Sequence, residues 1–216
     1  DGHELHAYVA RPSGAPIAGL IVIQEAFGVT RHIRSVTDGW AREGFLAVAP
    51  ALFDRVERGV ELGYSQEDLQ RGVAMIRQGT PDDRMTDVAA ALEYARRETG
   101  KKVGIVGYCL GGSVAWLAAT HLNADAAVGY YGSQIPAYGA ENPRTPVMLH
   151  FGAEDAHIPK DQVDSKVAAL HPEVPIYWYE GAGHAFNNDD RPSYHPTAAK
   201  LARERSLAFL RQHLTA

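Results

Sequence analysis

The stretch "VGYCLGG" at residues 106–112 contains the only cysteine of the 216-residue sequence. Cys109 follows the apolar run "KVGIVGY" (102–108) and lies between Gly107 and Gly111. A nucleophile framed by two glycines at this spacing is typical of a nucleophile elbow, where a strand turns sharply into a helix. Glycine is needed on both sides because side chains there would collide across the turn. The stretch therefore predicts a strand, a strained turn that presents the thiol, and a helix.

Short apolar runs like the one before Cys109 recur along the whole chain. They are rich in Val, Ile and Tyr, which is typical of strands covered on both faces in a parallel sheet. A stretch with alternating polar and apolar residues, "HELHAYVARP" (3–12), predicts an additional edge strand. We expect the buried strands at residues 19–25, 45–50, 102–108, 126–132, 146–152 and 175–180.

Helical stretches with recognisable ends separate these strands. Gly44 is suited to follow a helix over 31–43, Ser65 with Asp68 forms a capping-box pattern, and Thr80 with Pro81 marks another helix start. Alternating strands and helices predict a three-layer α/β sandwich on a mostly parallel sheet, with ligands at the carboxyl ends of the strands. No repeat or linker is evident, so we expect one domain over 1–216. The expected helices span 31–43, 65–78, 80–99, 112–122, 160–170 and 196–214.

Composition limits the classes of function. The sequence is 45% hydrophobic and 22% charged, with a net charge of −5, which gives no electrostatic reason to expect nucleic acid or an anionic membrane as partner. No apolar run approaches the roughly 20 residues that span a bilayer. A single cysteine excludes an internal disulfide, and no metal-ligand spacing is present, so we expect no metal and no other cofactor. We expect a cytoplasmic protein, although the sequence begins at Asp1 without a methionine.

A nucleophile needs a base, and the base needs an orienting acid. A lone cysteine is often structural, but the elbow favours Cys109 as nucleophile over Ser113, which lies inside the following helix. Such folds carry the nucleophile, the acid and the histidine in that order along the chain. Asp155 in the loop "AEDAHIP" and His184 in the loop "GAGHAF" both follow strands in this order. Glu154 remains an alternative acid.

Two other histidines are less suited to act as the base. His157 lies only two residues after Asp155, which leaves little room to approach the cysteine. His150 lies within a predicted strand, so we expect it to be a hydrogen-bonded residue of the core.

The end of the strand 19–25 provides a second element of the site. An oxyanion hole needs one N–H from the residue after the nucleophile and one from the loop after an earlier strand. These are Leu110 and Ala26. Glu25, at the same strand end, then lies near the thiol, where a negative charge would oppose formation of a thiolate.

The segments "VIQEAFGV", "VGYCLGG", "AVGYYG", "GAEDAHIP" and "WYEGAGHAF" together resemble the dienelactone hydrolases over essentially the whole chain. The resemblance implies an α/β-hydrolase fold and a triad of Cys109, His184 and Asp155. It also implies a role for Glu25: the resting thiol is protonated and turned towards this carboxylate, which substrate then displaces. Glu25 takes the proton while the thiolate turns to His184.

The resemblance further implies a substrate. It would be a dienelactone, opened to maleylacetate, whose carboxylate is held by two arginines. The first matches Arg71, but Asn188 occupies the second position, and the nearest arginine is Arg191. Because a neutral amide cannot replace a bidentate guanidinium, the natural substrate is left open. Phe27 and Tyr131, within the matching segments, are also expected to bind substrate.

Three functions follow from these observations. The first is a cysteine-dependent hydrolase of small esters or lactones, either dienelactone hydrolase-like or a more general carboxylesterase, acting as a monomer or homodimer. The second is a cysteine amidase or glutaminase. The third is a ligand-binding module on a hydrolase fold, against which a complete triad argues.

Overall fold

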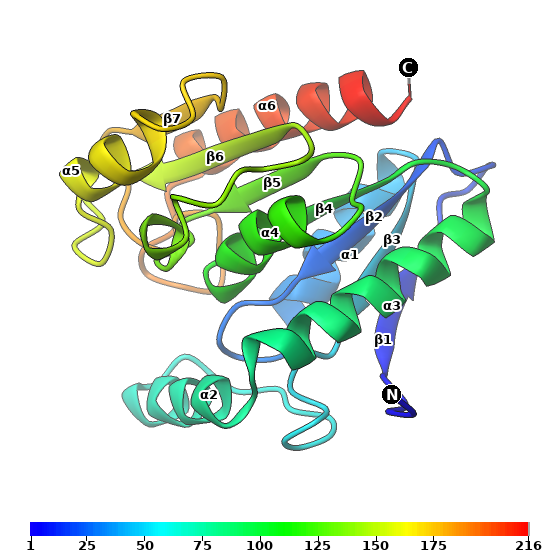
Figure 1. Cartoon of the computed structure of the whole chain (residues 1–216). Coiled ribbons are helices and arrows are strands. Elements are labelled where there is room, and N and C mark those ends of the chain that lie inside the picture. Colours follow the sequence, from blue (N-terminus) through cyan, green and yellow to red (C-terminus); the bar gives the residue numbers. More distant parts are fainter. Residues whose placement is uncertain (216) are drawn as a thin grey trace.

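The computed structural model describes residues 1–215 and has a seven-stranded sheet in the order β1-β3-β2-β4-β5-β6-β7 (Figure 1). Only β1 is antiparallel, and it pairs with β3 at the edge of the sheet. All other neighbouring strands are parallel, as the continuous apolar runs predict. The strands are β1 (Ala7–Ala10), β2 (Ala18–Ile23), β3 (Phe45–Pro50), β4 (Val103–Tyr108), β5 (Ala127–Tyr130), β6 (Val147–Gly152) and β7 (Ile176–Tyr179).

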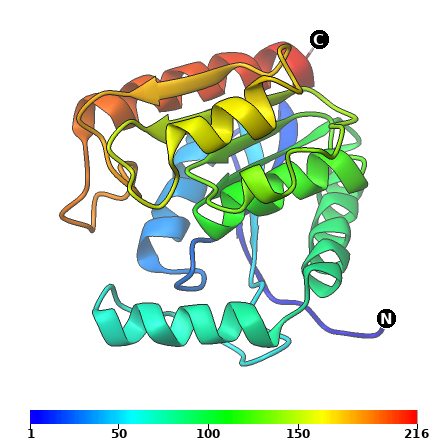
Figure 2. The ribbon, with the colours of Figure 1, turned by 60° about the vertical axis from the view of Figure 1, so that its left-hand side comes forward.

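Helices cover both faces of the sheet, which confirms the predicted α/β sandwich. In Figures 1 and 2, α1 (Arg31–Arg42) and α6 (Pro196–Leu214) lie on one face. The other face carries α3 (Pro81–Thr99), α4 (Leu110–His121) and α5 (Lys160–Val163). Among the described residues, no helix has both the length and the apolar character that crossing a membrane requires.

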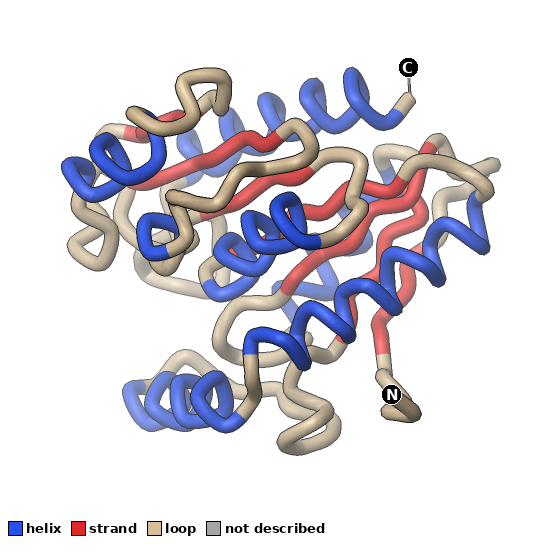
Figure 3. The backbone as a smooth tube through the Cα atoms, in the orientation of Figure 1, coloured by secondary structure: helices blue, strands red, loops and turns tan. Residues whose placement is uncertain are grey.

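One helix, α2 (Gln66–Gln78), lies off the sheet and is clearly separate from both helical layers in Figure 3. It packs on the loop after β2. A Cβ atom built at Gly72 would lie 2.0 Å from the carbonyl oxygen of Ala26. The helix therefore lies close over the carboxyl end of β2, where the sequence predicts the functional site.

Local sequence signals define the helix ends as predicted. Ser65 and Asp68 form a reciprocal capping box at the start of α2, and the Thr80 side chain caps α3. Gly44 (φ 99°) and Gly100 (φ 64°) follow α1 and α3 in the left-handed region, which glycine adopts at low cost.

Two helices differ from the prediction. The helix after the elbow begins at Leu110 rather than at residue 112, because the chain enters it directly after Cys109. The helix expected over 160–170 is α-helical only to Val163 and continues as a π-helical turn over Asp164–Ala168. In that turn the N–H of Ala169 bonds the carbonyl of Asp164, five residues earlier.

Candidate active site

The elbow has the strained geometry that its sequence predicts. Cys109 lies between β4 and α4 with φ 55° and ψ −112°, outside the regions that side chains favour. A Cβ at Gly107 would lie 1.8 Å from the carbonyl oxygen of Gly111, and one at Gly111 would lie 2.4 Å from that of Ile23. Both glycines are therefore required for the turn to pack against itself and against β2.

Three side chains from the ends of β4, β6 and β7 meet at this turn. The Sγ atom of Cys109 lies 3.2 Å from Nε2 of His184. On the other side of the ring, Nδ1 of His184 lies 2.7 Å from Oδ2 of Asp155. The structure thus brings together the nucleophile, base and acid candidates in one continuous chain of contacts.

Asp155, rather than Glu154, is the carboxylate that contacts the histidine. Its side chain is fully buried, and its second oxygen accepts a hydrogen bond of 2.9 Å from the backbone N–H of His157. Glu154 is exposed. The buried carboxylate is held from two sides, which fixes the orientation of the His184 ring.

Opposing influences act on the protonation of His184. Burial lowers its pKa, but the hydrogen bonds to Asp155 and Cys109, together with their charges, outweigh burial and raise the pKa to about 10. These contacts favour the protonated ring, an imidazolium, next to the sulfur. A neighbouring positive charge of this kind favours a thiolate.

Backbone strain is concentrated around this ring. Among the residues that the structure describes, three other than glycine have positive φ: Cys109, Tyr131 (39°) and Ala185 (60°). Ala185 follows His184 directly, and the ring of Tyr131 lies 5.3 Å from the His184 ring. Strained backbone of this kind clusters at functional sites, where packing holds side chains in otherwise unfavourable positions.

Glu25 lies in the same region and is almost completely buried, with 1% of its surface exposed. Its Oε2 accepts a hydrogen bond of 2.7 Å from the side chain of Asn188, and its Oε1 has no partner among the described residues. Burial raises the pKa of Glu25, an effect that nearby His32 and Arg191 and the Asn188 hydrogen bond reduce. Glu25 is therefore more easily protonated than an exposed glutamate.

The expected resting position of the thiol is wrong for this structure. The resemblance implied a thiol turned towards Glu25, but the sulfur faces Nε2 of His184. The physical reason is that each group has another partner: the imidazole binds the sulfur, while Asn188 binds the carboxylate.

The two predicted oxyanion donors lie where β2 and α4 meet. The N–H of Gly111 donates to the carbonyl of Gln24 at 3.1 Å, which draws the start of α4 against the end of β2. Within residues 1–215, the N–H groups of Leu110 and Ala26 make no hydrogen bond. Both donors are therefore free to bind a developing oxyanion.

The predicted substrate residues divide into two groups. Arg71 lies on α2, half exposed, and its guanidinium pairs with Glu57 at 2.7 Å rather than with a residue of the triad. Phe27, Tyr131 and Asn188 are all buried near the triad or Glu25. The hydroxyl of Tyr131 has no partner among the described residues.

Sequence reasoning missed Tyr64, which joins this second group. Its ring packs edge-on against Phe27 with 4.9 Å between centroids, and its hydroxyl accepts a hydrogen bond from Asn188 at 3.2 Å. The Arg191 guanidinium lies 5.6 Å from the Phe27 ring and 5.7 Å from the Tyr64 ring. The loop sequence around Tyr64 has no periodic signal that indicates a site residue. Only the folded chain brings Tyr64 next to Phe27 and Asn188.

One group of possible metal ligands occurs in residues 1–215, and it does not include the triad: His32, Asp189 and Asp190. His32 bonds Asp189 at 2.9 Å, and Asp190 pairs with Arg31. Because Asp190 already pairs with Arg31 and Asp189 already contacts His32, the group is poorly suited to a cation.

A mostly parallel sheet, a nucleophile elbow, and an acid and a histidine at strand ends define the α/β-hydrolase class. The model of the dienelactone hydrolase family matches residues 5–214, and the chain belongs to this family. It is thus a carboxylic ester hydrolase that acts on small esters and lactones.

Individual proteins agree with this assignment. A carboxymethylenebutenolidase from Pseudomonas putida is 35% identical over 97% of this chain and 92% of its own length. A crystal structure from Klebsiella pneumoniae, provisionally described as a dienelactone hydrolase, has a TM-score of 0.83 at 32% identity and covers 98% of this chain and 94% of its own. An esterase from Thermogutta terrifontis shares the fold, with a TM-score of 0.70 at 15% identity, covering 98% of this chain and 90% of its own.

Proposed function

We propose that Cys109 is the nucleophile of this hydrolase and that ester or lactone cleavage passes through a thioester. The observation that carries the proposal is the continuous contact from Sγ of Cys109 through His184 to Asp155, with distances of 3.2 and 2.7 Å. Nucleophile, base and orienting acid within hydrogen-bond reach are the signature of covalent catalysis.

In the acylation step, the thiolate of Cys109 attacks the carbonyl carbon of the substrate. A C–S bond forms, and the electron pair of the carbonyl π bond moves to oxygen, where the N–H groups of Leu110 and Ala26 bind it. Each donor of this kind contributes roughly 2.7–4 kcal/mol to stabilisation of the transition state. The intermediate then collapses, the C–O bond of the ester breaks, and the leaving oxygen takes a proton from the imidazolium of His184.

In the deacylation step, His184 must act as a base towards water. Contact with the sulfur is one of the influences that raise the pKa of His184. Because a thioester sulfur carries no charge, acylation removes that influence and the pKa falls. His184 is then better able to remain neutral and accept a proton from water, which attacks the thioester and releases the acid product and Cys109.

We infer that Glu25, beside the thiolate, is easier to protonate than an exposed glutamate. Burial raises the pKa of Glu25, and a neutral carboxyl does not oppose a nearby thiolate as a carboxylate would. The hydrogen bond from Asn188 keeps Glu25 in place beside the site.

We infer that the substrate is a small lactone or ester with an anionic arm, such as the dienelactone 4-carboxymethylenebut-2-en-4-olide, and that Arg191 binds this arm. Arg191 lies against Phe27 and Tyr64 and makes no ion pair with the described residues. The name of the Pseudomonas putida relative, carboxymethylenebutenolidase, supports this substrate class. Arg71, already paired with Glu57, is the weaker candidate.

The test compares hydrolysis of p-nitrophenyl acetate and of the dienelactone by the parent protein and by Cys109→Ala. Loss of a triad nucleophile leaves only the contribution of binding and the oxyanion hole, so we expect activity to fall by about 10³-fold or more. Mass spectrometry of a His184→Ala protein after mixing with the aryl ester should detect one acetyl group on Cys109.

Ser113→Ala is the matched control, since Ser113 is the rival nucleophile and lies in the first turn of α4, the helix that follows Cys109. Its hydroxyl is buried and accepts a hydrogen bond from the N–H of Gln134. We expect this variant to keep its activity within a few-fold. Equal rates for Cys109→Ala and the parent would rule out the thioester route.

A cytoplasmic location and a monomeric or homodimeric state complete the proposal. A catalytic free thiol such as Cys109 suits a compartment whose reductants keep thiols reduced. Cell fractionation and sedimentation analysis of the purified protein would test the two statements separately.

A further inference from the structure

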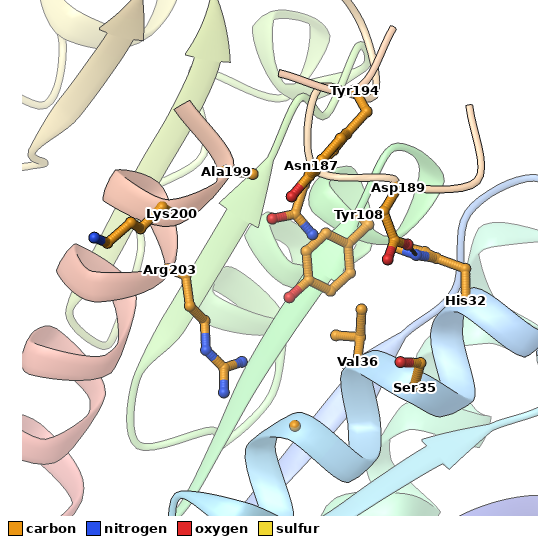
Figure 4. A pocket seen from close by; sticks show the side chains of 11 residues that line it. His32, Ser35, Val36, Tyr108, Asn187, Asp189, Tyr194, Ala199, Lys200 and Arg203 are labelled. Carbon is orange, nitrogen blue, oxygen red and sulfur yellow. Dashed lines mark hydrogen bonds and ion pairs between the residues drawn. The ribbon is translucent and has the colours of Figure 1, made fainter. Parts of the chain in front are cut away.

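A cavity of about 280 Å³ lies between α1 and α6, beside the loop that follows the candidate base (Figure 4). None of the triad residues lines it. Its lining includes His32 on α1, Tyr108 at the end of β4, Asn187 and Asp189 in the loop, and Lys200 and Arg203 on α6. Its volume fits a small organic molecule but not a bulky one.

Arg203 provides a positive charge without a counter-ion in this cavity. Its guanidinium carbon lies 3.3 Å from the centroid of the Trp40 ring, so the guanidinium lies over the indole. It makes no hydrogen bond or ion pair with any residue in 1–215, although burial is strong enough to lower its pKa. Arg203 is partly exposed, and its N–H groups, which no described residue accepts from, are available to an acceptor that enters the cavity.

Tyr108 and His32 provide further unused hydrogen-bonding capacity. The Tyr108 hydroxyl accepts a hydrogen bond of 3.3 Å from Trp40 but donates to no described residue, and Figure 4 shows it on the side of Arg203. His32 is 2% exposed, and its Nε2 is buried without a partner among the described residues. The lining thus contains two donors that lack acceptors and one uncommitted ring nitrogen.

These groups select a carboxylate. The planar fork of a guanidinium matches the two oxygens of a carboxylate, and a hydroxyl can donate a further hydrogen bond to the same group. Lys200, which is exposed and pairs with Glu204 at 4.0 Å, and Asp189, which contacts His32 at 2.9 Å, also line the cavity. The apolar part of the lining, including Val36 and the Tyr108 ring, suits a short carbon chain.

We propose that the cavity between α1 and α6 is a second, non-catalytic binding site for a small organic carboxylate, and that a carboxylate bound there acts on the catalytic site. The carboxylate group lies against Arg203 and the Tyr108 hydroxyl. The cavity is separate from the position of Arg191, where the substrate arm is expected.

Two covalent connections and one electrostatic connection link this cavity to the catalytic residues. Tyr108 directly precedes Cys109, so a ligand that contacts Tyr108 contacts the residue next to the elbow. Asn187 and Asp189 flank Asn188, which holds Glu25. The charge of His32 also lowers the pKa of Glu25, and an anion in the cavity would reduce that effect.

The binding half of the proposal is tested by calorimetric titration of succinate into the Cys109→Ala protein, with sodium chloride added to equal ionic strength as the reference. Succinate contains no ester bond that the enzyme could cleave, so the result does not depend on the proposed nucleophile. We expect saturable binding that Arg203→Gln weakens by about tenfold or more, since a charge-assisted contact is lost. Arg203→Lys, which keeps the charge but loses the fork, should bind with intermediate affinity.

Arg97→Gln is the matched control, because Arg97 is exposed on α3 on the other face of the sheet. It should leave succinate affinity unchanged, and neutral succinamide should not bind. Arg191→Gln should also leave the affinity unchanged, which separates this cavity from the catalytic site. Tyr108→Phe, expected to weaken binding, keeps the test informative if Arg203→Gln does not fold.

The effector half is tested by hydrolysis of a neutral aryl ester with increasing succinate. The rate should change saturably in the parent protein, with no matching change in Arg203→Gln. Absence of binding, equal affinity of the parent and Arg203→Gln proteins, or loss of binding in Arg191→Gln would overturn the proposal. Binding without any change in rate would overturn the statement that the bound carboxylate acts on the catalytic site.

Discussion

The side-chain nitrogen of Asn188 donates a hydrogen bond of 2.7 Å to Oε2 of Glu25, a residue 163 positions earlier in the chain. Both residues are almost fully buried. Asn188 occupies the position at which the resemblance to the family implies an arginine that holds substrate. In this protein Asn188 instead binds the carboxyl group of Glu25 near the candidate nucleophile. Its side-chain nitrogen is therefore used in a contact within the protein.

This contact predicts a strong coupling between Glu25 and Asn188. Asn188→Ala leaves a buried carboxyl without its donor, and we expect a loss of about 1–3 kcal/mol in the free energy of unfolding. In the background of Glu25→Gln, which carries no charge, the same change should cost less. Denaturant unfolding of the four proteins of the double-mutant cycle measures the difference. If the two substitutions lower the free energy of unfolding additively, the predicted coupling between Glu25 and Asn188 is contradicted.

The contact between Asp155 and His184 predicts a loss of rate when the acid is made neutral. An asparagine at this position can favour the wrong tautomer of the ring, so Asp155→Asn should lower kcat by about 10⁴-fold. Glu154→Gln is the matched control, because Glu154 is adjacent but exposed. Steady-state hydrolysis of the aryl ester measures both variants. A larger loss for Glu154→Gln than for Asp155→Asn would assign the acid to the other residue.

The packing of the elbow predicts that Gly107 tolerates no side chain. Since a Cβ there would lie 1.8 Å from the carbonyl oxygen of Gly111, Gly107→Ala should lower the free energy of unfolding by about 3 kcal/mol or more. Gly14→Ala is the control, because a Cβ at Gly14 meets nothing within 4 Å. Thermal unfolding compares the two, and equal melting temperatures would mean that the elbow can relax without cost.

The position of Arg191 predicts selectivity for charged substrates. Arg191→Gln should raise KM for the anionic dienelactone by about tenfold or more, since a charge-assisted contact is lost. Its KM for a neutral aryl ester should change little. Arg71→Gln, which removes an arginine paired with Glu57, should affect the two substrates equally. A selective effect of Arg71→Gln instead would move the carboxylate site to α2.

A buried histidine outside the triad predicts a pH-dependent stability. His150 is completely buried, with Nδ1 2.8 Å from the Tyr179 hydroxyl and Nε2 2.9 Å from Oγ of Ser206. Burial, with a smaller effect of Arg205, lowers its pKa from 6.5 to about 3. Between these two values the unfolded chain binds a proton that the folded protein does not. Stability from this residue is therefore complete above the unfolded pKa and is lost as the pH falls towards the folded pKa.

The measurement is the free energy of unfolding of the parent and of His150→Gln at about pH 7.5 and about pH 5. Between these conditions the parent should lose about 2 kcal/mol more than the variant. His150→Gln will be less stable than the parent at both pH values, because the hydroxyls of Tyr179 and Ser206 lose their contacts with the imidazole. Only the difference in pH dependence between the two proteins reports the titration of His150. Parallel pH dependences of the two proteins would show that His150 does not carry the effect.

The sequence by itself determined the sheet, the helix ends and the elbow, because these depend on signals between neighbouring residues. Apolar runs mark the strands, the Ser65–Asp68 pair and Gly100 mark helix ends, and Gly107 and Gly111 mark the turn at Cys109. The order of the triad candidates along the chain was also readable, since strand ends of a parallel sheet meet at one edge.

Tertiary structure decided which side chains meet across that edge. The contact of His184 with Asp155 rather than Glu154, the direction of the thiol towards His184 and the contact of Asn188 with Glu25 all join residues that are far apart in sequence. Tyr64 entered the site, and Arg71 paired with Glu57. Such contacts depend on rotamers and on competition among partners in three dimensions, which no spacing of residues along a chain encodes.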